Sequence, residues 1–291
     1  MKALVDADSL IFKCGFAVEH KKYKLFQKGL EEHGCIEAYN YKRDIPKDRL
    51  LDEEVSLVVD TEIEPLENCL HLVRQSLESI LENTKATSYQ VYIKGKGNFR
   101  EEISKTRVYK GNRDVTHRPK YEAQIREYLI KYWGAEVVDG MEVDDKVCIE
   151  QSHDLAQFSY EEKCGDNYTE CWAGTIICTI DKDLDQVPGW HYSYATNEKY
   201  WVEPEAALTY FYVQLLSGDA SDNIEGLPKV GVKTAIKLLE NTNLTDKDLY
   251  TKCLEVYQER LGESKGKQRL VEMASLLYLK RSIDDQWKPP V

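Results

Sequence analysis

Acidic residues recur in four short stretches of the chain, in types and spacings that could hold cations. Asp6-Ala7-Asp8-Ser9 and Asp181-Lys182-Asp183-Leu184-Asp185 each follow a short apolar run directly. Glu142-Val143-Asp144-Asp145 opens a pattern typical of a helix. Gly218-Asp219-Ala220-Ser221-Asp222-Asn223 carries two acids three residues apart, which would face one way on a helical turn. These stretches are the strongest candidates for chemistry in the sequence.

Acids gathered in one place would favour metal-dependent chemistry. Packed carboxylates repel one another and cannot all ionise unless cations lie between them. Oxygen-rich acidic clusters suit Mg²⁺ or Mn²⁺. Two such ions roughly 4 Å apart can activate a water and stabilise the leaving oxygen of a phosphodiester. The acids therefore suggest phosphoryl hydrolysis, although each stretch alone could simply cap a helix or form a turn.

Basic residues gather in one segment of an otherwise acidic chain. The net charge is −12, yet residues 94–120 contain nine Lys and Arg against three acids, so this segment is +6 and the remainder is −18. Within it, Lys110 and Arg113 lie three residues apart, and a helix would aim both at one phosphate. Tyr109 offers a ring for base stacking. The segment predicts a polyanion-binding region, with a solvated charged helix as the alternative.

The string Gly226–Ala235 has the spacing GxxxxGxKT, which narrowly misses the GxxxxGKT of a phosphate-binding P-loop. No strand precedes it, so nucleotide binding is not expected. The glycines instead permit a tight turn between two helices. Its N–H groups, with Lys229, Lys233 and Lys237, could hold a phosphate backbone without reading sequence. This pattern predicts a helix–hairpin–helix.

Strands and helices that alternate would position these residues. Apolar runs predict buried strands at residues 3–5, 90–93, 136–138 and 176–180, and helical patterns lie at 66–81, 121–132 and 143–158. This alternation predicts an α/β fold with a mostly parallel sheet, in which ligands bind at the carboxyl ends of the strands. We expect a core over residues 1–200 with insertions at 19–61 and 160–174, followed by a helical subdomain over 201–291.

The N-terminus and the cysteines indicate the cellular compartment in which the protein is expected. Met1-Lys2-Ala3-Leu4-Val5-Asp6 reaches an acid too soon for a signal peptide, and no run of 18 apolar residues exists. The eight cysteines are scattered without a CxxC pair, which favours reduced thiols. A cytoplasmic protein that does not bind membranes is expected.

In this order, the motifs resemble those of the 5′-nuclease family: phage 5′–3′ exonucleases, flap endonucleases and the 5′-nuclease domain attached to bacterial DNA polymerases. The resemblance extends from Asp6 to about Leu239, and its most specific parts are residues 109–113, 142–145 and 218–235. It implies a PIN-like α/β domain with a basic helical arch over about 94–125 and a helix–hairpin–helix over about 216–240. It also implies the cytoplasm of a bacterium or a phage-infected host cell.

The resemblance also implies roles for individual residues. Eight acids would hold two divalent ions, Mg²⁺ or Mn²⁺: Asp6, Glu142, Asp144, Asp145, Asp181, Asp183, Asp219 and Asp222. Lys110 and Arg113 would contact the scissile phosphate from the arch, with Tyr109 stacked nearby. The turn would bind duplex DNA, with K⁺ on its carbonyls, through Gly226, Lys229, Gly231, Lys233 and Lys237. The expected partner is DNA with 5′ ends, nicks or flaps, bound by a monomer.

One departure from the family pattern concerns the second strand, which usually ends in Asp. Here Tyr92-Ile93 leads to Lys94, so a ligand is missing and a positive charge stands near its place. We hypothesise that Asp8 compensates as a further metal ligand. Two alternatives stay open: a PIN-type ribonuclease, which would share the acids, and a non-catalytic binder of branched DNA, in which Lys94 has disabled the site.

Overall fold

The computed structural model describes residues 1–29, 31–113, 117–156 and 174–290. The chain forms two compact units. The first comprises Met1–Ser9, Ser76–His117 and Leu129–Val291, and the second comprises Leu10–Gln75 and Arg118–Tyr128. The sheet and the C-terminal helices both lie in the first unit.

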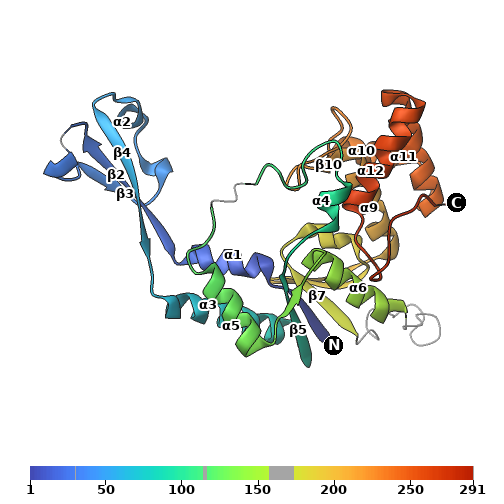
Figure 1. Cartoon of the computed structure of the whole chain (residues 1–291), viewed down its shortest axis with the longest axis horizontal. Coiled ribbons are helices and arrows are strands. Elements are labelled where there is room, and N and C mark those ends of the chain that lie inside the picture. The colour runs from blue at the N-terminus through green and yellow to red at the C-terminus, as the bar shows by residue number, and fades with distance from the viewer. Residues whose placement is uncertain (30, 114–116, 157–173, 291) are drawn as a thin grey trace. The chain divides into compact units, whose positions relative to one another are not determined.

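A six-stranded sheet forms the core of the first unit, in the order β6-β5-β1-β7-β8-β9. Figure 1 labels β5 and β7 of this sheet. The strands are β1 (Lys2–Asp6), β5 (Ser88–Lys94), β6 (Glu136–Val138), β7 (Thr175–Thr179), β8 (Gly189–Ser193) and β9 (Glu198–Val202). All neighbours pair in parallel except β8 and β9. The predicted α/β class with a mostly parallel sheet is confirmed, whereas β8 and β9 were not predicted.

The register of the central strands places the acids that follow β1 and β7 at the same edge of the sheet. In β1, Asp6 pairs with Tyr92 of β5, and Val5 pairs with Cys178 of β7. The carboxyl ends of β1 and β7 therefore lie side by side at one edge of the sheet. The acids that follow these two strands start from that common edge, as expected for a parallel sheet.

Helices alternate with the strands and build a second core. The predicted helices are present as α3 (Leu66–Thr84), α5 (Glu122–Trp133) and α6 (Val143–Ala156), although the predicted end at Phe158 lies outside the described residues. The C-terminal part contains α9 (Pro204–Ser217), α10 (Val232–Leu239), α11 (Asp246–Leu261) and α12 (Glu263–Leu277). These four helices share a buried apolar cluster that includes Leu215, Leu249, Tyr257 and Leu270. The expected helical C-terminal part is therefore present.

The second unit contains the segment predicted as an insertion. It forms an antiparallel sheet in the order β3-β2-β4, from β2 (Glu19–Gln27), β3 (Glu37–Tyr39) and β4 (Val55–Ile63). Short helical turns at Glu31–His33, Lys42–Asp44 and α2 (Lys47–Leu51) lie between these strands. Helix α1 (Asp8–Ala17) leads into the unit. The other predicted insertion, 160–174, falls outside the described residues except for Gly174.

The basic segment departs from the helix expected there. Helix α4 (Phe99–Ile103) is short, and residues 104–113 form turns and bends. Lys110 has a left-handed backbone with φ 53°, which an α-helix does not accommodate. Turn hydrogen bonds join Gly111 N to Val108 O at 3.0 Å and Arg113 N to Lys110 O at 3.1 Å. The prediction of a helix through Lys110 and Arg113 is therefore wrong for these residues.

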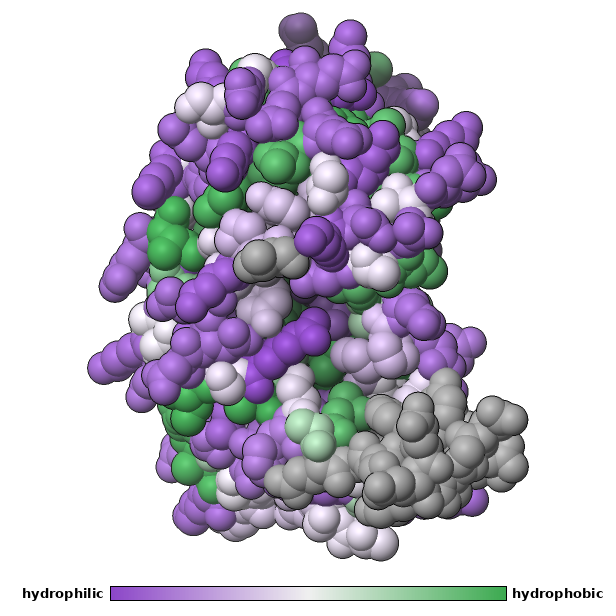
Figure 2. Space-filling view, turned by 90° about the vertical axis from the view of Figure 1, so that its right-hand side faces the viewer, coloured by the Kyte–Doolittle hydropathy of each residue, from purple (hydrophilic) through white to green (hydrophobic). Residues whose placement is uncertain are grey.

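A composition rich in charged residues predicts a hydrophilic surface. The face seen in Figure 2 is hydrophilic over most of its area and carries small hydrophobic areas between charged side chains. Within the described ranges, no helix combines the length and the apolar character needed to cross a membrane.

Candidate active site

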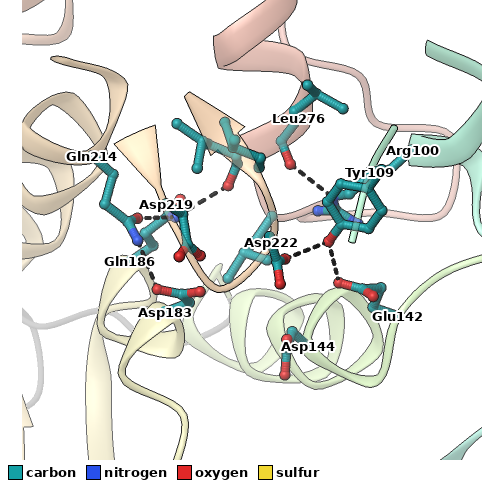
Figure 3. Close-up of a pocket in the computed structure, with 13 residues that line it drawn as sticks. Arg100, Tyr109, Glu142, Asp144, Asp183, Gln186, Gln214, Asp219, Asp222 and Leu276 are labelled. Atoms are coloured by element: carbon teal, nitrogen blue, oxygen red, sulfur yellow. Dashed lines mark hydrogen bonds between the residues drawn. The ribbon is translucent and has the colours of Figure 1, made fainter. Parts of the chain in front are cut away.

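A pocket in the first unit collects acids that are far apart in the sequence (Figure 3). Three segments supply them: the start of α6, the 3₁₀ turn η4 (Lys182–Gln186), and the hairpin of β10 (Gly218–Asp219) and β11 (Ile224–Glu225). The polar lining residues are Arg100, Tyr109, Glu142, Asp144, Asp183, Gln186, Gln214, Asp219 and Asp222. The pocket therefore joins three of the four acidic stretches to the basic segment.

The fourth stretch contributes Asp6, at the carboxyl end of β1. Its side chain is buried and accepts hydrogen bonds from Thr179 Oγ1 at 2.9 Å and from the backbone N of Asp8 at 3.1 Å. Burial and the charge of Asp8 raise the pKa of Asp6 to about 7, and the charge of Asp181 raises it further. Asp6 therefore lies within electrostatic reach of the acids that follow β7.

Asp144 and Asp181 link Asp6 to the rest of the site. Burial raises the pKa of Asp144 well above its usual value, and the charges of Asp6, Asp181 and Glu142 raise it further. Asp181 begins η4 by accepting a hydrogen bond from Asp183 N at 3.0 Å. Its pKa is also raised, chiefly by burial. The charges of acids from all four stretches therefore influence one another.

Asp183 and Asp219 share a hydrogen bond on the hairpin side of the pocket. Burial and the charges of Asp181 and Asp219 raise the pKa of Asp183 to about 8. Burial alone would raise the pKa of Asp219, but hydrogen bonds from the hydroxyl and backbone N of Ser221, at 2.7 and 2.8 Å, help to lower it. The opposite directions of the two pKa shifts follow from these different surroundings.

Two glutamines that the sequence did not single out orient Asp183. Gln214 Nε2 donates to Asp183 Oδ1 at 2.6 Å, and Gln186 Nε2 donates to Gln214 Oε1 at 2.7 Å (Figure 3). Both amides are buried. No local sequence pattern distinguishes such a glutamine from an ordinary one, because its partner lies about 30 residues away.

The basic segment reaches into the pocket between Glu142 and Asp222. The Tyr109 hydroxyl lies 2.8 Å from Glu142 Oε2 and 2.6 Å from Asp222 Oδ2. Lys110 Nζ donates to Glu142 Oε1 at 2.5 Å, and Arg113 Nη2 donates to Asp222 Oδ1 at 2.7 Å. Burial would raise the pKa of Glu142, but the charges of Lys110 and Arg100 hold it at about 2. Lys110 and Arg113 therefore meet the acids directly.

Backbone contacts fix the same segment to the β10–β11 hairpin. Lys110 N donates to Asp222 O at 2.9 Å, and the side-chain amide of Asn112 donates to Ala220 O at 2.8 Å. The side-chain amide of Asn223 returns a bond to Val108 O at 2.9 Å. The left-handed turn at Lys110 is therefore held by tertiary contacts.

Tyr109 requires a correction. Its ring is 7% exposed and belongs to the apolar cluster of the C-terminal helices. An enclosed ring cannot stack on a base, so the predicted stacking role does not fit this structure. The hydroxyl instead bridges two acids of the pocket.

Asp145 also differs from the expectation that it holds a metal with its neighbours. Its side chain is 0% exposed, and its oxygens accept bonds from Arg100 Nη1 at 2.5 Å and Nη2 at 3.0 Å. It is absent from the residues that line the pocket. Asp144 and Asp145 are adjacent in the sequence but face different surroundings, and we leave Asp145 out of the candidate ligands.

Asp8 and Lys94 are in contact at the end of β5, where Lys94 stands in place of the expected Asp. Asp8 Oδ1 accepts a hydrogen bond from Lys94 N at 2.9 Å, and Lys94 Nζ lies 3.6 Å from Glu142 Oε1. An ammonium group therefore stands beside the acids at the end of β5. Asp8 lies close enough to Asp6 to raise its pKa.

The donor chemistry of the pocket fits divalent cations. Among the described residues, no three acidic, histidine or cysteine side chains converge closely enough to enclose an ion as they stand. However, the raised pKa values of Asp6, Asp144 and Asp183 show negative charge packed without sufficient compensation. A divalent cation relieves such repulsion, and carboxylate oxygens are the ligands that Mg²⁺ and Mn²⁺ prefer.

The glycine-rich turn precedes α10. Gly231 is the residue before the helix, and Lys233 and Lys237 are exposed along it. Lys229 has a left-handed backbone with φ 60°. A Cβ built on Gly226 would come within 2.2 Å of the carbonyl carbon of Ser217, so Gly226 is needed for close backbone packing.

Comparison with known proteins finds similar sequences for most of the chain. No family model matches the chain. The chain is 30% identical over 224 residues to DNA polymerase I of Bacillus subtilis (strain 168), covering 74% of this chain and 24% of that protein. DNA polymerase I of Bacillus caldotenax is 30% identical over 218 residues, covering 72% and 24%. The chain thus spans about a quarter of the length of these curated relatives.

Solved structures extend the likeness to almost the whole chain. A flap endonuclease of bacteriophage T5, in a pseudo-enzyme-product complex with DNA and metal ions, gives a TM-score of 0.54 at 16% identity over 96% of this chain and 89% of that one. The T5 5′-exonuclease with bound zinc gives 0.53 at 15% identity over 95% and 89%. The chain is thus similar in fold to these phage T5 nucleases, and over about three quarters of its length it is similar in sequence to bacterial DNA polymerase I.

Proposed function

We propose that the chain hydrolyses phosphodiester bonds of DNA at or near 5′ ends, in a reaction that needs two divalent ions, Mg²⁺ or Mn²⁺. One observation carries the proposal: acids from three separate stretches line one pocket, Asp6 of the fourth stretch lies within electrostatic reach of Asp144, and Lys110 and Arg113 bind the lining acids Glu142 and Asp222. The relatives named above, a flap endonuclease and a 5′-exonuclease, support the DNA substrate and the 5′ polarity.

Different residues of the chain would bind the ions and the phosphate. The proposed ion ligands are Asp6, Glu142, Asp144, Asp181, Asp183, Asp219 and Asp222, with Asp8 as a further candidate. When bound, such ions would activate a water and stabilise the leaving oxygen of the phosphodiester. Lys110 and Arg113 would donate hydrogen bonds to the phosphate oxygens and neutralise charge that develops there.

The helix–hairpin–helix would hold the duplex beyond the cleavage point. The N–H groups at the start of α10 and the exposed Lys233 and Lys237 can bind phosphates without reading bases. The carbonyls of the turn before α10 are candidate ligands for K⁺, and we propose that the protein acts as a monomer.

Product mapping tests this function. Flap, nicked and blunt DNA, labelled at the 5′ or the 3′ end, would be incubated with Mg²⁺, with Mn²⁺ or with a chelator. We expect cleavage near the 5′ end only when metal is present, and the product lengths separate exonuclease from flap endonuclease action. Cleavage of matched RNA but not DNA would favour the ribonuclease, and flap binding without hydrolysis in either metal would favour the non-catalytic binder.

A further inference from the structure

Arg100, which lines the pocket, forms an enclosed ion pair with Asp145. Their side chains are 2% and 0% exposed, and the guanidinium binds both carboxylate oxygens, at 2.5 and 3.0 Å. Burying two charges is costly unless the geometry is good and the remaining donors and acceptors are satisfied. Such a pair in this place calls for an explanation beyond general stability.

The pair also binds the last turn of α12 and the backbone that follows it. Arg100 Nε donates to Leu276 O at 2.7 Å, and Arg100 Nη2 donates to Tyr278 O at 2.8 Å. The backbone N of Lys280 donates to Asp145 Oδ1 at 3.1 Å. The pair therefore ties the segment 276–280 to α4 and to the first turn of α6.

Asp145 also fixes the residue before α6. It is the third residue of the helix, and its Oδ2 accepts a hydrogen bond from the backbone N of Glu142 at 3.2 Å. An acid that reaches back in this way is one half of a capping box, which sets how the chain enters a helix. In the same turn as Asp145, Glu142 and Asp144 line the pocket (Figure 3).

We propose that Arg100 and Asp145 are positioning residues: the pair holds the first turn of α6 so that Glu142 and Asp144 present their oxygens to the divalent ions, and Asp145 itself is not a ligand. The inference rests on the proposed metal-dependent function. To bind an ion, Asp145 would have to give up four hydrogen bonds and leave the Arg100 charge buried alone. Residues that orient metal ligands typically change metal affinity about 10- to 100-fold when they are replaced.

The test compares metal binding with folding in paired variants. Removing one partner would strand a buried charge, so the informative variant replaces both, as Arg100→Met with Asp145→Leu. A matched control, Lys146→Met with Glu150→Leu, removes an ion pair of 2.9 Å further along the same helix. Mn²⁺ affinity would be measured calorimetrically without DNA, with the melting temperature as the check on folding.

We expect the Arg100/Asp145 variant to melt cooperatively but to bind Mn²⁺ about 10- to 100-fold more weakly, while the control keeps its affinity. Hydrogen exchange of the metal-free protein supplies a second readout. The amides of residues 142–144 should exchange faster in the Arg100/Asp145 variant than in the wild type. They should be unchanged in the control.

Two results would overturn the inference. One is a folded Arg100/Asp145 variant with wild-type Mn²⁺ affinity and unchanged exchange at residues 142–144. The other is loss of one bound ion in Asp145→Asn together with full affinity in Arg100→Lys, which would make Asp145 a ligand. A wild-type protein that binds no Mn²⁺ would instead refute the proposed function, and the exchange measurement would still decide whether the pair positions the turn.

Discussion

At the scale of single residues, surroundings rather than residue type decide what each carboxylate does. Asp144 and Asp145 are neighbours in the sequence, yet Asp144 faces the charges of Asp6 and Asp181 while Asp145 is paired with Arg100. Glu142 is held ionised by the nearby cations, chiefly Lys110 and Arg100. The pocket therefore mixes acids that retain protons with acids that are fully charged.

These retained protons predict a pH-dependent stability in the absence of metal. The pKa values of Asp6 and Asp183 rise from an ordinary 3.8 to about 7 and about 8. Because the folded state binds these protons more tightly than the unfolded state, their contribution to stability is full below about pH 4 and is lost as the pH rises through 7 to 8. In a chelator, the melting temperature should fall between pH 6 and pH 9, and Mg²⁺ should restore it most at the upper end.

Asp183→Asn serves as the control for this titration, since it should flatten part of the slope. A melting temperature with the same pH dependence in Mg²⁺ and in chelator would contradict the assignment of these protons to a cation site.

Asp8 carries the second prediction at this scale. If Asp8 replaces the missing acid at the end of β5, Asp8→Ala should abolish cleavage while flap DNA still binds with wild-type affinity. Asp139→Ala is a matched control, because Asp139 Oδ1 accepts a bond from the backbone N of Lys96, two residues after Lys94. Single-turnover cleavage and equilibrium binding would be measured side by side, and near-normal turnover in Asp8→Ala would refute the hypothesis.

At the scale of elements, the β10–β11 hairpin carries Asp219 and Asp222 into the pocket because two glycines let its backbones approach. Gly218 has φ +74°, and a Cβ there would lie 2.2 Å from Gly226 N. A Cβ on Gly226 would meet the backbone of Ser217 and Gly218 at 2.2 to 2.4 Å. Because the obstacles are backbone atoms, side-chain adjustment cannot relieve either contact.

Gly226→Ala should therefore destabilise the protein more than Gly231→Ala. We expect a loss of about 1–3 kcal/mol, or more, for Gly226→Ala, as for other overpacked sites. Gly231 has φ −92°, and a Cβ added there would meet nothing within 4 Å, so its replacement should cost only about 0.5–1 kcal/mol through a poorer N-cap of α10. Denaturant unfolding measures both, and equal losses would show that the hairpin is not tightly packed.

The elements that the sequence predicts well are those with local signals. The apolar runs at β1, β5, β6 and β7 predict strands within two residues of their ends, and the parallel class follows from their alternation with helices. In contrast, β8 reads Gly-Trp-His-Tyr-Ser, which has no apolar run, and it was missed.

Long-range contacts explain the errors at the site. The helix expected around Lys110 yields to a left-handed turn that the β10–β11 hairpin holds from more than 100 residues away. Asp145 is separated from Arg100 by 45 residues, so no local spacing shows that the two pair. The set of acids was readable from the sequence, whereas the assignment of each acid to a pocket or to a partner was not.

At the scale of the whole molecule, a net charge of −12 means that the proposed DNA binding would depend on a few local positive regions. Besides the basic segment, α10 presents the exposed Lys233 and Lys237. Each phosphate that such a side chain neutralises releases counterions. Loss of that side chain therefore lowers the salt dependence of binding.

Replacing both lysines of α10 should weaken duplex binding for all sequences alike. For Lys233→Ala with Lys237→Ala, the slope of log affinity against log salt should become shallower by about 1.8, because each lost phosphate contact removes about 0.9. Lys28→Ala with Lys47→Ala makes the same change in net charge on the exposed insertion. Fluorescence anisotropy over a salt series gives both slopes, and equal changes in the two variants would remove α10 from the DNA interface.

A crystal structure of the protein soaked in Mn²⁺ tests most directly whether the pocket binds two divalent ions, because anomalous difference density locates the manganese. We expect two peaks in the pocket, with oxygens of Asp6, Asp144, Asp181 and Asp219 among their ligands, and Asp145 still paired with Arg100. A pocket without peaks, at Mn²⁺ concentrations that support cleavage, would contradict the proposed metal site.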